Sequence, residues 1–294
     1  MRAILVLSLT MIFFGSELFA GGHSSTLQDV KARGKLRCVV TTGLPGFAAP
    51  DANGVWRGFD WDFCRATAAA VLGDANAVDP ITSTGKTRFT KLNAGEGDVL
   101  WRNTTITFSR DVSVKLRFLG VNYYDGQGFM VNKSLGVSSA KELDGASVCI
   151  QTGTTTELNL ADYFASNNMS YEAVTIETND EARQNYEAGR CDIYTTDASG
   201  LASTRSSLPN PNDHMVHPEI ISKEPLGPAV RQGDDAWADI ITWVLAATIT
   251  AEELGVTSSN VDQMKNSNNP EIRRMLGTDG CLLYTSDAAD EGWC

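Results

Sequence analysis

Short apolar runs alternate with amphipathic segments along most of this chain, and this alternation constrains the fold more than any other feature. Extended runs at 35–42, 78–84 and 171–176 are each followed by a segment with helical periodicity. Strands that alternate with helices are typical of a parallel sheet covered by helices. A length of 294 residues is enough for two domains. We therefore expect an α/β fold with mostly parallel sheets.

The stretch 98–110 changes character along its length. It begins as a short apolar run, typical of a buried strand, and continues with hydroxyl, amide and guanidinium groups. Open α/β sheets bind small molecules at the carboxyl ends of their strands. Arg110 can bind a carboxylate bidentately, and Asn103 and Thr105 can add neutral hydrogen bonds. The alternative is a surface turn with a solvated arginine.

Two features in the second half of the chain have the same character. An expected strand at 146–151 runs into a helix start, where Thr154 and Glu157 form a capping box and Thr155 adds a hydroxyl. Such a helix start is also a plausible anion site. Asp197 ends an expected strand at 191–197, where its carboxylate can either hold an ammonium group or cap the next helix.

Phe47 and Arg88 are further candidates, each with a structural alternative. Phe47 lies in a loop at 43–54, where its ring can cover a ligand or anchor the loop on the core. Lys86 and Arg88 lie at the start of an expected helix, where cations do not complement the helix dipole. This placement indicates either a role outside helix stability or a solvated pair.

The N-terminal segment is predicted to be a secretory signal peptide at 1–22. Met1 and Arg2 precede an apolar run at 3–14, and small residues follow at 20–22. The run is too short to span a bilayer comfortably. We therefore expect the mature protein to be exported and soluble.

Cysteine, histidine and charge content narrow the classes of partner. Six cysteines fit an oxidising compartment, but there are only three histidines and no cluster with zinc-binding spacing. We therefore expect no metal and no cofactor. The formal net charge of −12 argues against nucleic acid or an anionic membrane surface as a partner.

Five segments in combination resemble the type II periplasmic binding proteins for polar amino acids, which are soluble receptors of ATP-driven importers. These segments read GLPGFAAPDANGVWRGFDWDFCRA, YYDGQGFMV, QTGTTTELNLADYF, EAGRCDIYTTDASGLAS and PEIISKEPLGPAVR. They look closest to the general L-amino-acid-binding branch. The resemblance covers about residues 27–280.

This resemblance implies a two-lobed Venus-flytrap fold in which each lobe is a mostly parallel sheet flanked by helices. Lobe 1 would comprise 27–124 and an incomplete return part at 223–280, lobe 2 would comprise 125–222, and two crossing segments would form the hinge. The implied ligand is a free L-amino acid, and the implied partners are permease subunits of an ABC transporter in the inner membrane. The protein would be a monomer in the periplasm of a Gram-negative bacterium.

The resemblance also assigns roles to individual residues. Arg110 matches the arginine that binds the ligand carboxylate, supported by Thr105, Thr155 and the adjacent Thr154, and Asp197 matches the aspartate that binds the ammonium group. Arg88 stands at the position of an arginine that contacts the ligand side chain in acidic amino-acid binders. Phe47 matches a loop aromatic, and Asn103 stands where relatives use a hydroxyl. Leu44 stands where many relatives place a stacking aromatic, and Arg102 receives no role.

In such a fold Cys149 and Cys191 would begin neighbouring strands of lobe 2, so we expect them to form a disulfide. Cys38 and Cys64 would lie on a strand and its following helix, and they form the second candidate pair. Residues 281–294, with Cys281 and Cys294, have no periodicity and resemble translated adapter sequence. We therefore interpret them as a foreign tail on a truncated reading frame.

Two other functions fit the same fold. One is a periplasmic enzyme such as a cyclohexadienyl or arogenate-type dehydratase, and the other is the ligand-binding domain of a membrane sensor. The enzyme is disfavoured because the sequence shows no nucleophile-base pair, and no histidine or glutamate near the expected cleft that is evidently placed to take up a proton.

Overall fold

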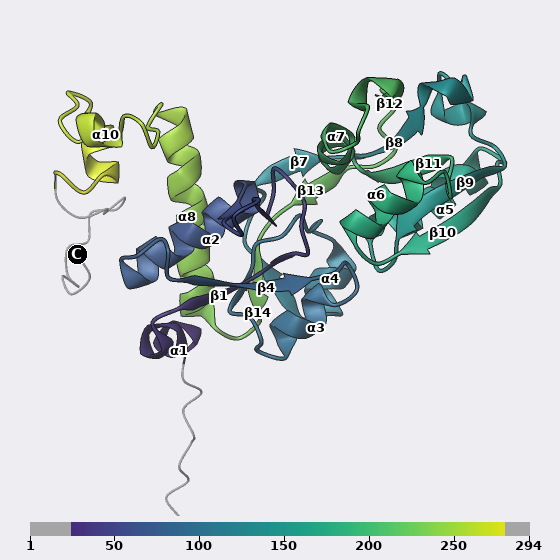
Figure 1. Cartoon of the computed structure of the whole chain (residues 1–294). Helices are drawn as coiled ribbons and strands as arrows, with labels where there is room; N and C mark the ends of the chain where they lie inside the picture. The colour runs from purple at the N-terminus through teal and green to yellow at the C-terminus, as the bar shows by residue number, and fades with distance from the viewer. Residues whose placement is uncertain (1–24, 280–294) are drawn as a thin grey trace, which may run out of the picture.

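Residues 25–279 are described by the computed structural model, and they form two sheets that are each flanked by helices (Figure 1). The signal peptide expected at 1–22 and the foreign tail expected at 281–294 lie outside the described residues. Within the described range, no helix is long and apolar enough to cross a membrane.

The first sheet has five strands in the order β4-β1-β5-β14-β6. Its strands are β1 Leu36–Thr41, β4 Val78–Ser83, β5 Val99–Leu100, β6 Leu116–Phe118 and β14 Ala229–Arg231. β1 pairs in parallel with β4 and β5, whereas β14 runs antiparallel to both β5 and β6. The chain therefore returns to this sheet after more than a hundred residues elsewhere.

Helices of the first sheet complete what we call lobe 1. They are α1 Thr26–Arg33, α2 Phe59–Leu72, α3 Arg88–Asn93, α4 Phe108–Val112 and α8 Asp235–Glu253, and the short strands β2 Ala49–Pro50 and β3 Trp56–Arg57 lie beside them. The long helix α8 packs Trp237 and Ile241 against the core that β1 and α2 also share. The short helices α9 Val261–Met264 and α10 Pro270–Met275 follow α8.

The second sheet also has five strands, in the order β10-β9-β11-β8-β12, and with its helices it forms lobe 2. Its strands are β8 Gln127–Asn132, β9 Ala146–Gln151, β10 Tyr171–Ile176, β11 Ile193–Asp197 and β12 His214–Val216. β9 pairs in parallel with β10 and β11, and β8 runs antiparallel to β11 and β12. Its helices are α5 Thr155–Ser166, α6 Asn179–Glu187 and α7 Ala198–Ser206, with 3₁₀ turns η1 Lys133–Leu135, η2 Ala140–Glu142 and η3 Pro211–Asp213.

A two-stranded ribbon lies between the two lobes (Figure 1). It consists of β7 Tyr123–Asp125 paired antiparallel with β13 Glu224–Leu226. The return passage of the chain is divided into β13 in the ribbon and β14 in the first sheet. Both passages of the chain between the lobes run through this ribbon.

Sequence composition explains why the central strands are buried on both faces. In β1, Leu36, Val39 and Val40 are fully buried, because helices cover both sides of a parallel sheet and apolar residues need not alternate with polar ones. β5 is only two residues long, since polar residues begin at Arg102. The strands therefore end where the polar segments begin.

Both expected disulfides form. Cys38 of β1 is bonded to Cys64 of α2, and Cys149 of β9 is bonded to Cys191, which directly precedes Asp192 and β11. The loops that they close span 26 and 42 residues. Each bond lies within one lobe, so neither restricts movement of one lobe against the other.

Removal of either disulfide is expected to destabilise its own lobe. By loop-closure entropy the Cys149→Ala/Cys191→Ala variant should lose about 4 kcal/mol and the Cys38→Ala/Cys64→Ala variant about 3.5 kcal/mol in the free energy of unfolding. Denaturant unfolding with and without a reductant measures both losses. The expectation fails if reduction leaves the unfolding midpoint of the parent protein unchanged.

Candidate functional site

A small polar cavity lies where the two lobes meet. Every residue that lines it is polar. Lobe 1 contributes Arg88, Arg102, Asn103 and Thr105, and lobe 2 contributes Gln151, Thr154, Thr155, Thr156, Thr196 and Asp197. The polarity of this lining suits a polar ligand group rather than an apolar one.

The topology of the two sheets brings these residues together. Gln151 ends β9 and Asp197 ends β11, while Asn103 and Thr105 follow β5. The carboxyl ends of parallel strands meet at one edge of a sheet, and in this protein the edges of the two sheets face each other. Thr154 caps α5 by accepting a hydrogen bond from Glu157 N, as the capping box predicts.

Two glycines allow close approach of the lobes beside the cavity. A Cβ atom on Gly85 of lobe 1 would lie 2.9 Å from Thr154 Cγ2, and one on Gly153 of lobe 2 would lie 3.0 Å from Lys86 Cα. Gly153 also has φ of +71°, a conformation that side chains disfavour. Larger residues at either position would push the lobes apart.

The lobe 1 wall of the cavity carries two buried guanidinium groups. Arg88 and Arg102 are 3% and 4% exposed. Arg88 Nη1 donates to Thr104 Oγ1 (3.1 Å) and to the carbonyl oxygen of Asn103 (3.3 Å). The Nε atoms of both arginines and Oδ1 of Asn103 are buried without a hydrogen-bond partner. This wall therefore has unused hydrogen-bonding capacity.

Burial is the main influence on the pKa values of these two arginines. It lowers the pKa of Arg88 well below its ordinary value, and the charges of Arg102 and Arg110 add to that effect. Burial also lowers the pKa of Arg102 to about 10, although the carboxylates of Asp60 and Asp197 partly oppose the shift. A negative ligand group placed here would relieve this cost.

Asp197 is the acidic group on the opposite wall. It is buried and stands at the N-cap position of α7, yet its side chain makes no capping hydrogen bond. The capping alternative for its carboxylate is therefore wrong. Burial, together with the charges of Asp125 and Glu224, raises the pKa of Asp197 to about 8, against the opposing charges of Arg88 and Arg102. A cationic ligand group would stabilise the ionised carboxylate.

Arg110 does not line the cavity. It is 7% exposed, so the alternative of a solvated surface arginine is wrong. Its Nη1 donates to the carbonyl oxygen of Thr105 (2.7 Å), so the guanidinium is held by a residue that lines the cavity. The guanidinium carbons of Arg110 and Arg88 both lie over the ring of Phe89, 5.2 and 4.8 Å from its centroid. Burial lowers the pKa of Arg110 to about 10, against the opposing charges of Glu224 and Asp197.

Glu224 is a buried carboxylate at this site that the sequence reasoning missed. It lies at the start of β13 and is 1% exposed. Its carboxylate accepts hydrogen bonds from the Thr105 hydroxyl, from Thr155 Oγ1 (2.8 Å), from Asn159 Nδ2 (2.7 Å) and from Ser222 Oγ (2.7 Å). A glutamate therefore lies near the cleft, with its carboxylate oxygens already engaged by these donors. These donors come from lobe 1, from lobe 2 and from the segment that leads into β13.

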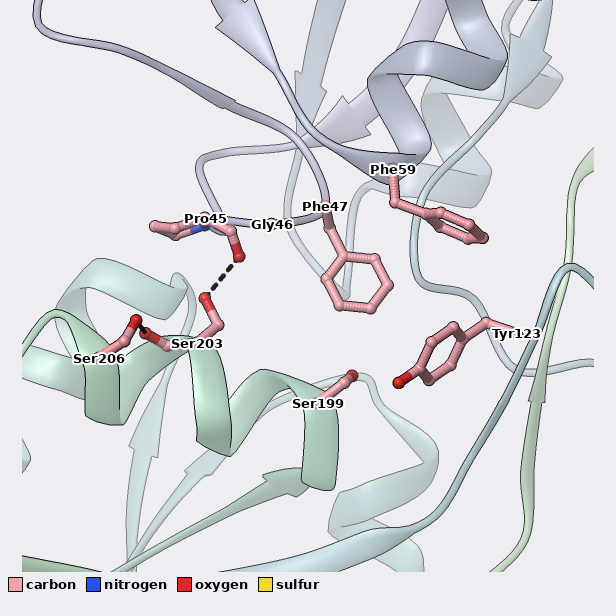
Figure 2. Close-up of a pocket in the computed structure, with 8 residues that line it drawn as sticks. All are labelled: Pro45, Gly46, Phe47, Phe59, Tyr123, Ser199, Ser203 and Ser206. Carbon is pink, nitrogen blue, oxygen red and sulfur yellow. Dashed lines mark hydrogen bonds between the residues drawn. The ribbon is translucent and has the colours of Figure 1, made fainter. Parts of the chain in front are cut away.

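Phe47 also lies apart from the polar cavity. It is 6% exposed and lines a separate pocket with Phe59 and Tyr123, opposite serines of α7 (Figure 2). Its ring centroid is 6.1 Å from that of Phe59 and 5.8 Å from that of Tyr123. Phe47 thus anchors its loop in an aromatic cluster, as the structural alternative proposed.

The structure brings six of the eight candidate ligand residues to the cavity and leaves out Arg110 and Phe47. The six are Arg88, Asn103, Thr105, Thr154, Thr155 and Asp197. Arg102, Gln151, Thr156 and Thr196 line it without having been predicted. Gln151, Thr156 and Thr196 adjoin predicted residues at strand ends or the helix start, so that pattern contained a signal for them.

In the range 25–279 there is no group of three or more histidine, cysteine, aspartate or glutamate residues arranged to hold a metal ion.

Comparison with known proteins identifies the family. Residues 36–259 match the bacterial extracellular solute-binding proteins, family 3. The chain belongs to this family. The two-lobed type II periplasmic binding fold implied by the sequence resemblance is thereby confirmed, and the enzyme alternative gains no support from the relatives described next.

Two curated relatives and one solved structure are especially similar. The glutamate/glutamine/aspartate/asparagine-binding protein BztA of Rhodobacter capsulatus is 61% identical, over 91% of this chain and 81% of that protein. The general L-amino acid-binding periplasmic protein AapJ of Rhizobium johnstonii is 58% identical, over 90% of this chain and 79% of that protein. An ABC transporter/periplasmic binding protein from Brucella ovis, solved with glutathione bound, is 55% identical with a TM-score of 0.84. The match covers 87% of this chain and 80% of that protein.

Replacement of Glu224 should weaken the junction between the lobes. In Glu224→Gln one carboxylate oxygen becomes an NH₂ group, which donates hydrogen bonds and cannot accept them. The variant therefore loses either the two bonds from Thr105 and Thr155 or the two bonds from Asn159 and Ser222. We expect a loss of about 2–3 kcal/mol in the free energy of unfolding, measured by denaturant unfolding. Glu96→Gln, a change on an exposed side chain, serves as the control and should have little effect. Equal stability of the two variants would contradict the assignment of Glu224.

The raised pKa of Asp197 predicts a pH dependence of stability. Its ordinary pKa is 3.8 and its folded-state pKa is about 8. The stability that the protonated carboxyl group contributes is therefore fully present below about pH 4 and is lost as the pH rises to about 8. Between pH 5 and 8, Asp197→Asn should therefore gain stability relative to the parent, by on the order of 1–3 kcal/mol. Thermal unfolding of both proteins across this range measures the difference, in which contributions from His214 and His217 cancel. A constant difference would refute the prediction.

Proposed function

We propose that this protein is a periplasmic receptor that binds a free L-amino acid and delivers it to the permease subunits of an ABC importer. The observation that carries this proposal is a polar cavity with an unpaired carboxylate on one wall and incompletely bonded guanidinium groups on the other. An amino acid carries the complementary pair of charges. The printed names of BztA and AapJ, which bind amino acids, support the same ligand class.

In the proposed complex the ligand joins the two lobes. Asp197 of lobe 2 holds the ammonium group, and Arg88 of lobe 1 faces the carboxylate end together with Thr154 and Thr155. Arg110 supports this end from behind Thr105 through its charge. Because the charged groups belong to different lobes, the ligand stabilises the closed arrangement, which the importer then recognises.

The movement is proposed to occur at the ribbon of β7 and β13. Lobe 1 would then comprise 27–124 with the return part from 223, and lobe 2 would comprise 125–222. Few hydrogen-bonded pairs form this ribbon, so it can bend while each five-stranded sheet stays rigid. The expected monomer suffices for this mechanism, since one chain supplies both walls of the cavity.

Catalysis is not part of this proposal. The relatives described above are binding proteins in name, and the residues that line the cavity include no cysteine, serine or histidine. Glu224 is the group that favours the dehydratase alternative, because a carboxylate near the cleft can act as an acid or base. Its carboxylate already accepts four hydrogen bonds, however, so it is not free to take up a substrate proton. Loss of a ligand during incubation with the protein, followed by chromatography, would favour the enzyme.

Isothermal titration against the twenty amino acids tests the receptor function, with glutathione added because the Brucella ovis protein was solved with it. We expect at least one L-amino acid to bind. Asp197→Asn should weaken that binding by about 30-fold or more, because a buried charged hydrogen bond is worth about 2 kcal/mol or more. Arg110→Ala should weaken it by about tenfold.

Asp162→Asn, on the exposed face of α5, is the matched control and should bind like the parent. Unchanged affinity in both Asp197→Asn and Arg110→Ala would refute the assignment of these residues. Binding of glutathione without any amino acid would refute the ligand class.

A further inference from the structure

Arg102 is the cavity-lining guanidinium group that makes no hydrogen bond to any other described residue. Arg88, its neighbour on the same wall, donates twice to lobe 1, and Arg110 donates to Thr105. The Nε atom of Arg102 is buried without a partner, and no described ion pair involves this side chain. Arg102 nevertheless lines the cavity at 4% exposure.

The nearby carboxylates do not account for this charge. Glu224 is held by four neutral donors, and Asp197 lies on the opposite wall. Asp60 interacts with Arg102 through its charge, but its carboxylate accepts the backbone N–H of Asn103 at 2.9 Å and makes no ion pair with the guanidinium. A buried guanidinium group without a direct partner is costly, and a ligand carboxylate would supply the missing bonds.

The number of guanidinium groups exceeds what one ligand carboxylate needs. The proposed site already offers Arg88 and Arg110 to the carboxylate of an ordinary zwitterion. Arg102 is a second arginine on the wall that Arg88 also lines, and it matches a ligand with a second negative group. Asn103, whose Oδ1 is also buried without a partner, adds an amide beside it.

We infer that Arg102 binds a second carboxylate on the ligand, so that the receptor prefers dicarboxylic amino acids to neutral amino acids of the same shape. This inference rests on the proposed function. Glutamate and glutamine are a matched pair of probes, because they differ by one charged group at nearly equal volume. Aspartate and asparagine form a second pair.

The test is isothermal titration of glutamate and glutamine into the parent, Arg102→Gln and Arg102→Lys. The parent should bind glutamate at least tenfold more tightly than glutamine. Arg102→Gln should raise the Kd for glutamate by about 10-fold to 100-fold and the Kd for glutamine by less than threefold, which removes the preference. Arg102→Lys keeps the charge without the planar fork and should retain part of the preference.

A purely structural role for Arg102 gives a different result. If Arg102 only offset the charge of Asp60, its replacement would weaken both ligands by the same factor, and this outcome would overturn the inference. Equal affinity of the parent for glutamate and glutamine would also overturn it, even if the variants fail to fold. Binding of neutral amino acids alone would overturn it while leaving the receptor function intact. Binding of no amino acid would reject the receptor function itself.

Discussion

The hydrogen bonds to the buried Glu224 carboxylate are the interaction on which the junction of the two lobes depends. Thr105 contributes from lobe 1, Thr155 and Asn159 from lobe 2, and Ser222 from the segment that leads into β13. Hydrogen bonds to an ionised group are about twice as strong as neutral ones. One carboxylate thus joins both lobes and the ribbon at a single point, directly beside the polar cavity.

The same junction leaves other charges unsatisfied. Arg88 and Arg102 keep buried Nε atoms without partners, and Asp197 has no capping hydrogen bond. A protein selected only for stability would replace such groups with apolar ones, since burial of an unpaired charge is costly. Arg88, Arg102 and Asp197 all line one cavity, and a binding site can have this property because the ligand supplies the missing partners.

The fold class could be predicted from the sequence because strand and helix periodicity are local properties. Asp197 and Thr155 could be predicted because Asp197 ends a strand and Thr155 begins a helix. Glu224 could not be found this way, since its partner Thr105 is 119 residues distant in sequence. Arg110 was expected to bind the ligand carboxylate directly, and its actual position depends on α4. That helix begins at Phe108 and turns the guanidinium back towards the carbonyl oxygen of Thr105.

The contacts between the lobes explain how a small ligand can control their arrangement. None of the ion pairs in the described range joins lobe 1 to lobe 2. Apart from Glu224, the lobes meet through neutral side-chain hydrogen bonds, which join Thr105 to Thr155, Asn179 to Thr41 and Ser203 to Pro45. Each neutral bond contributes about 0.5–1.5 kcal/mol, whereas each bond to a charged group contributes about 1.5–3 kcal/mol. A zwitterion held by Asp197 and Arg88 would therefore add a stabilisation of the closed arrangement comparable to that of these three contacts combined.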